Sequence, residues 1–103
     1  MAKAEIFAGI CGFNTTVEAQ KNDSGVHLAI ASECAAIQKL AQELSEVEPF
    51  QEISTRRGMP KSLEMGHKYC THAACPVPVG IIKVVEIAAG LALPKDVEIK
   101  LTR

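Results

Sequence analysis

The sequence has no tryptophan, and aromatic residues make up only 4% of its 103 residues, although hydrophobic residues reach 48%. Its core must therefore be built from alanine, valine, isoleucine and leucine, and the length suits one core in a single domain over residues 1–103. The sequence also lacks a large excess of positive or negative residues, since its formal net charge is −1. We therefore expect no nucleic-acid partner and no anionic membrane partner.

Long apolar runs are also missing, since none approaches the roughly 18–20 residues of a transmembrane helix. The first residues, Met1 to Glu5, lack the basic, apolar and small-residue regions of a signal peptide. We expect a soluble, cytoplasmic protein. In that compartment thiols stay reduced, so the four cysteines indicate metal binding or catalysis before disulfides.

Hydrophobic residues recur at two different spacings along the chain, one typical of strands and one typical of helices. Alternation predicts strands at 4–11, 15–21 and 26–30 and a last strand at 97–102, while helical spacing predicts helices at 34–47 and 79–91. Residues 50–69 show neither period clearly, and within them 51–55 fits a short strand. The order β-β-β-α-loop-α-β predicts an α+β fold with a mainly antiparallel sheet and two main helices on one face.

The cysteines fall where this topology brings chain segments together. The first and third strands of a meander run in the same direction, so Cys11 after the first and Cys34 after the third lie at one end of the sheet. Cys70 and Cys75 bracket a short loop before the second main helix, whose direction the sequence does not reveal. A site formed by all four cysteines requires that helix to start at the same end.

Two metal chemistries suit such a site. Structural zinc prefers four thiolates, usually in pairs of closely spaced cysteines, whereas here only Cys70 and Cys75 are paired. An iron–sulfur cluster accepts scattered cysteines, and the small residues around Cys75 and the proline after it suit a cluster-binding loop. His72, inside that loop, is a possible supporting residue that replaces a thiolate or donates a hydrogen bond to one.

Other interpretations stay open. Cys70 and Cys75 are close enough in the chain for thiol–disulfide exchange, although the sequence has no Cys-x-x-Cys motif. Free cysteine also packs as a small hydrophobe, which would account for Cys11 and Cys34 separately. Finally, an open sheet face carrying Phe7, His27 and Ala29 would suit a non-catalytic interaction module, such as a homodimer.

Three sequence features together resemble a small family of unknown function. They are an early Cys-Gly-Phe, a Ser-Glu-Cys that opens a helix, and His-Ala-Ala-Cys-Pro-Val-Pro before an Ala/Gly-rich helix. The resemblance implies a single-domain, four-cysteine protein of anaerobic bacteria and methanogenic archaea, and it carries no activity. An anaerobic setting favours iron–sulfur over zinc.

The first functional hypothesis is therefore a metal-binding protein in which Cys11, Cys34, Cys70 and Cys75 hold an iron–sulfur cluster or zinc. No acid–base machinery accompanies these cysteines, so electron transfer or cluster handling is expected rather than enzymatic turnover. A redox partner protein would follow from that role.

Overall fold

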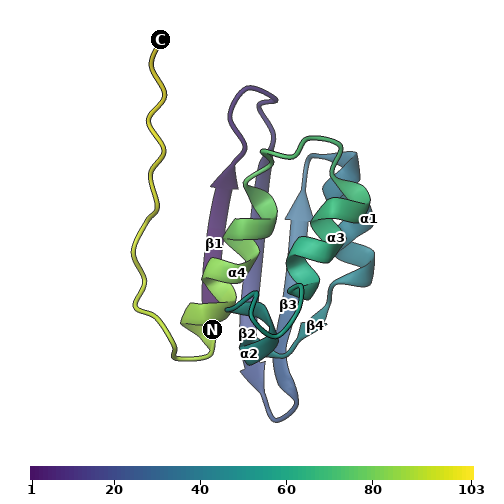
Figure 1. Cartoon of the computed structure of the whole chain (residues 1–103), viewed down its shortest axis with the longest axis vertical. Coiled ribbons are helices and arrows are strands. Elements are labelled where there is room, and N and C mark those ends of the chain that lie inside the picture. The colour runs from purple at the N-terminus through teal and green to yellow at the C-terminus, as the bar shows by residue number, and fades with distance from the viewer.

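The computed structural model describes all 103 residues, and its sheet is an antiparallel meander (Figure 1). The strands β1 (Ala2–Phe7), β2 (Asn14–Asn22), β3 (Gly25–Ser32) and β4 (Glu46–Val47) lie in the order β1-β2-β3-β4. Val17 at the centre of β2 is paired with Ala4 on one side and Ile30 on the other. This register places the apolar residues of all three long strands on one face.

Every helix covers that apolar face, and the opposite face of the sheet stays open (Figure 1). The helices are α1 (Ala35–Glu43), α2 (Pro49–Glu52), α3 (Lys61–Tyr69) and α4 (Val77–Ala88). Helix α4 packs on β1 and β2, α1 packs on β3, and α3 fits between α4 and α1. The predicted α+β class is thus confirmed.

The core between these layers is aliphatic, as the composition requires. Its fully buried side chains include Val17 and Val26 from the sheet, Ile37 and Leu40 from α1, and Ile81 from α4. The exposed face of the sheet carries polar residues, and His27 there lies 3.2 Å from a Glu46 carboxylate oxygen of β4. The His27 side chain is 53% exposed.

Several predicted boundaries were wrong. The first strand ends at Phe7 and gives way to a loop at 8–13, so Cys11 lies in that loop rather than on the strand. Residues 51–55 are not a strand, because α2 covers Pro49–Glu52, and the supposed loop contains α3. The short strand β4 follows α1, where the helix was expected to continue.

The last strand, expected at 97–102, is absent. Residues 93–103 form an extended segment without regular structure, which lies beside β1 but separated from the body of the protein in Figure 1. Val97, Ile99 and Leu101 alternate as predicted, but their exposed fractions are 63%, 75% and 87%. Alternation gives a segment the propensity for a strand, but a strand also needs a neighbour to share its backbone hydrogen bonds. This segment has no such neighbour within its own chain.

Candidate functional site

All four cysteines line one cavity at the end of the sheet where β1 and β3 finish. The cavity has a volume of about 490 Å³ and mainly apolar walls. Its lining comes from the β1–β2 loop, the start of α1, the loop after α3 and the start of α4, and includes Cys11, Cys34, Cys70, His72 and Cys75. The meeting of Cys11 and Cys34 at one end, expected from the meander, is thus seen in the structure.

Cys11 reaches the cavity from a tight turn. The Gly12 N–H donates to the Gly9 carbonyl at 2.9 Å, and Ala8 N–H donates to the Phe13 carbonyl at 3.1 Å, which closes the hairpin loop. Gly9 and Gly12 both have positive φ, 96° and 76°, which residues with a side chain rarely adopt. This geometry leaves Cys11 exposed at the rim of the cavity.

Cys34 is held at the junction between β3 and α1. It is the N-cap residue of α1, and its N–H donates to Ser32 Oγ at 3.1 Å. Ser32 Oγ in turn lies 2.7 Å from Oγ1 of the buried Thr15 on β2, and Thr15 also lines the cavity. The polar link from sheet to helix therefore fixes the backbone that carries the thiol.

Cys70 and Cys75 come from the connection between α3 and α4. The Cys70 N–H donates to the Gly66 carbonyl at 2.8 Å and ends α3, while the Cys75 N–H donates to the His72 carbonyl at 3.2 Å. Helix α4 starts two residues after Cys75 and runs away from the cavity (Figure 1). The direction of α4, which the sequence left open, thus brings this cysteine pair to the other two.

Three of the thiols influence one another. Burial away from water, together with the nearby Cys75 and Cys34 thiols, raises the pKa of Cys70 from 9.0 to about 11. All four cysteines are free. Without a positive charge nearby, the cavity therefore favours the protonated form of the Cys70 thiol.

The helices that start at this cavity have no side-chain caps. Neither α1 nor α4 has a side-chain hydrogen bond at its N-cap, and neither has an acidic residue in its first turn. Elsewhere carboxylates fill this role: Glu48 accepts from Gln51 N–H at 3.1 Å in α2. The buried Glu52 accepts from the first two N–H groups of α3, Lys61 at 2.8 Å and Ser62 at 2.9 Å.

Free N–H groups and the helix dipole give a helix N-terminus a partial positive charge that favours anions. First-turn residues of both uncapped helices, among them Ala36 and Val77, line the cavity with the cysteines. The arrangement is suited to hold thiolates or another anionic group. Sequence reasoning missed this pairing, although the lack of acidic residues in the first turns of both helices was a readable signal.

The thiols are not arranged as the complete ligand set of one ion. No three histidine, cysteine, aspartate or glutamate side chains converge closely enough to hold a single metal ion. Tetrahedral zinc requires sulfur atoms about 3.8 Å apart, as follows from its bond length of about 2.3 Å.

A family model matches residues 2–101 of the chain, and its description is a family of unknown function, DUF6951. The chain belongs to the DUF6951 family. Membership extends over nearly the whole length, as the resemblance seen in the sequence implied, and it assigns no activity to this DUF6951 protein. No curated protein and no solved structure matches the chain. None of the four helices has the length and apolar character needed to cross a membrane.

Proposed function

We propose that this protein holds an iron–sulfur cluster on the thiolates of Cys11, Cys34, Cys70 and Cys75. Its role would be electron transfer, or passing the cluster to other proteins, in the cytoplasm. The observation that carries the proposal is that four cysteines from separate segments line one cavity into which two uncapped helices open. Such a cluster supplies the capacity to accept and release single electrons.

The shape of the cavity supports a cluster over zinc. A cluster contains several iron and sulfide ions, so its cysteine ligands lie farther apart than the ligands of a single ion. Cysteines gathered around a cavity of about 490 Å³, with no three groups set for one ion, fit that wider spacing. The resemblance to a four-cysteine family of anaerobic organisms also favours iron.

The charge balance supports the same assignment. Four thiolates and their cluster carry net negative charge, which the N-termini of α1 and α4 offset. The small side chains of Ala36 and Ala74 on the cavity wall leave room for backbone N–H groups to approach cluster sulfur. His72 also lines the cavity, and its ring would donate a hydrogen bond to a ligand sulfur.

The deciding experiment is anaerobic purification, followed by iron, sulfide and zinc analysis and a visible absorption spectrum. We expect brown protein with iron and sulfide in equal amounts. Serine substitution of any one of the four cysteines should lower the cluster content, whereas Ala74→Ser, which adds a hydroxyl to the same wall, should retain it. Colourless, metal-free protein with four titratable thiols would contradict the proposal. Colourless protein with stoichiometric zinc would show that the four cysteines bind zinc instead of an iron–sulfur cluster.

A second candidate function is thiol–disulfide exchange between Cys70 and Cys75. The Cys75 thiol lies near enough to Cys70 to raise its pKa, which favours this function. However, the raised pKa of Cys70 keeps that thiol protonated at neutral pH, and the protonated form is a poor nucleophile. The two functions differ in their dependence on Cys11 and Cys34, because a Cys70–Cys75 switch should survive Cys11→Ser and Cys34→Ser.

A further inference from the structure

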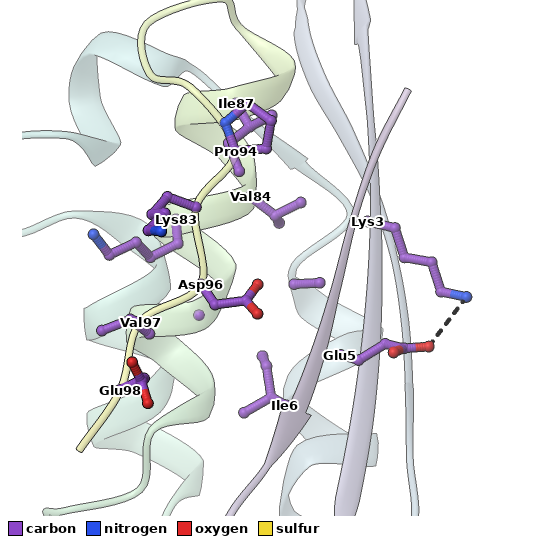
Figure 2. A pocket seen from close by; sticks show the side chains of 13 residues that line it. Lys3, Glu5, Ile6, Lys83, Val84, Ile87, Pro94, Asp96, Val97 and Glu98 are labelled. Atoms are coloured by element: carbon purple, nitrogen blue, oxygen red, sulfur yellow. Dashed lines mark ion pairs between the residues drawn. The ribbon is translucent and has the colours of Figure 1, made fainter. Parts of the chain in front are cut away.

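The C-terminal segment borders a second and larger cavity, whose lining includes none of the cysteines. One wall is formed by β1 and α4, through residues such as Ile6, Val84 and Ile87, and the other wall is residues 94–98. Its volume is about 1110 Å³. Figure 2 shows Ile6 projecting from β1 into the space between that strand and the C-terminal segment, while Lys3 and Glu5 project from the other face.

On the β1 side, the cavity wall is a sheet edge whose backbone N–H and C=O groups have no partner strand. β1 is the first strand in the order β1-β2-β3-β4, so its outer backbone groups have no partner strand. Such an edge is a template for another strand, and proteins commonly cover it. The arm, defined here as residues 93–103, runs alongside β1 in the same direction but makes no backbone hydrogen bond to it (Figure 1).

The sequence of the arm allows it to form a strand that pairs with the same arm of a second copy. In an antiparallel pair of arms centred on Ile99, the Ile99 side chains face each other and Val97 lies opposite Leu101. Glu98 of each arm then lies opposite Lys100 of the other, which gives two pairs of opposite charge on the other face. A shift by two residues would place either the two Glu98 or the two Lys100 side chains opposite each other, so the register centred on Ile99 is the one without a like-charge pair.

We propose that two copies of this chain form a symmetric dimer by exchanging their arms. The arm of each copy enters the cavity between β1 and the arm of the other copy. The result is one continuous sheet in which the two arms lie at the centre, each between the other arm and the partner's β1. A twofold axis through Ile99 makes the arrangement closed, since each arm fills the partner's cavity.

Dimensions and burial agree with this arrangement. Val97 to Leu101 spans about 17 Å as a strand, at about 3.4 Å per residue, which fits within the six-residue β1. Two arms alone would form a ribbon of marginal stability, whereas β1 on each side and α4 above supply the additional strands and the apolar cover. Val97, Ile99 and Leu101, all highly exposed in the single chain, become buried against Ile6, Val84 and Ile87.

Exchange of the arms is separate from the cysteine site. The two cavities share no lining residue. Substitutions in the arm should therefore leave metal content and the fold of each copy unchanged, so a dimer defect is not confused with a loss of the proposed cluster.

Sedimentation equilibrium of the full chain tests the proposal. We expect twice the chain mass of 11.0 kDa, and the mass of one chain after truncation beyond Pro94. Lys100→Glu places like charges opposite Glu98 and should weaken the dimer at least tenfold, and adding Glu98→Lys should restore much of the affinity. Lys39→Glu on the exposed surface of α1 is the matched control and should have no effect.

A cross-link tests the register. Ile99→Cys should give, after mild oxidation, a covalent dimer whose peptide map joins two arms at position 99, because the twofold axis passes through that residue. A monomer at all concentrations would overturn the proposal, including one in which the arm folds onto its own β1. A dimer that persists without the arm would overturn it as well.

Discussion

Gly66 of α3 packs directly against the ring of Pro78 in α4: a Cβ at position 66 would lie 2.6 Å from Pro78 Cγ. The two helices approach each other closely at this point because one partner has no side chain and the other is a flat ring. The approach lies four residues before Cys70 and three residues after Cys75, so it determines how the loop between these cysteines closes over the cavity.

Gly66→Ala should therefore destabilise the protein, although alanine normally favours a helix by up to about 1 kcal/mol over glycine. The proline ring cannot move aside as a flexible side chain would, so the helices must separate, at a net cost of about 1–3 kcal/mol. Urea unfolding measures this cost. His67→Ala, on the exposed surface of the same helix, is the control, and a more stable Gly66→Ala protein would contradict the packing described here.

Cys11→Ser should separate stability from cofactor binding. Cys11 is exposed in the β1–β2 loop and contributes nothing to the core, so the free energy of unfolding of the metal-free protein should change by less than about 0.5 kcal/mol. The same substitution should lower the cluster content after anaerobic reconstitution. Calorimetry of the metal-free form and iron analysis of the reconstituted form measure the two effects, and a stability loss would show that Cys11 has a packing role.

The pKa of Cys70 predicts a loss of stability of the metal-free protein at alkaline pH. The folded state binds the Cys70 proton more tightly than the unfolded state, since the pKa is raised from 9.0 to about 11. The stabilisation is present in full below pH 9 and is lost as the pH rises towards 11. Urea midpoints measured across this range should fall, and Cys70→Ser should flatten that fall. Equal slopes for the two proteins would exclude Cys70 as the cause.

Ala36→Asp should have opposite effects on the two forms of the protein. A carboxylate in the uncapped first turn of α1 should stabilise the metal-free protein by about 0.3–1 kcal/mol through the helix dipole. In the cavity, however, the same charge would repel an anionic cluster and reduce its retention. Ala36→Asn provides similar size without charge and should retain the cluster. Thermal unfolding and the rate of bleaching by a chelator measure the two effects.

The meander was predictable because its signals are local. The β2–β3 turn contains Asn22, whose side chain accepts from Ser24 N–H at 3.0 Å, and a glycine at position 25. A Cβ on Gly25 would collide with the Val47 carbonyl oxygen of β4, so the turn is restricted by tertiary packing as well. The two-residue β4 was too short to produce any period in the sequence.

Helix α3 was missed for a physical reason. Its buried residues are Ser62, Met65 and Gly66, of which only one is a large hydrophobe, so no apolar period was visible. The helix depends instead on distant partners, namely the Glu52 carboxylate at its N-terminus and the Pro78 ring against Gly66. Such tertiary contacts leave no pattern within the segment itself.

The cysteine cavity was predictable only in part. The parallel course of β1 and β3 brought Cys11 and Cys34 to one end by topology alone, but the start of α4 at that end depends on how α3 and α4 pack together. The prediction of the last strand was wrong for a different reason. The alternation of Val97, Ile99 and Leu101 was seen correctly, but no strand pairs with this segment in the structure, and its side chains stay exposed.

The fourteen buried members of the core are thirteen aliphatic side chains and one methionine, and the partly buried Cys34, Cys70 and Cys75 only pack against them. A chain that needs a metal ion to fold cannot release the ion without unfolding. Here we expect the chain to fold first and to bind the proposed cluster afterwards. Under the proposed function, the folded protein without a cluster would be stable, would bind the cluster when iron and sulfide are plentiful, and would release it without unfolding.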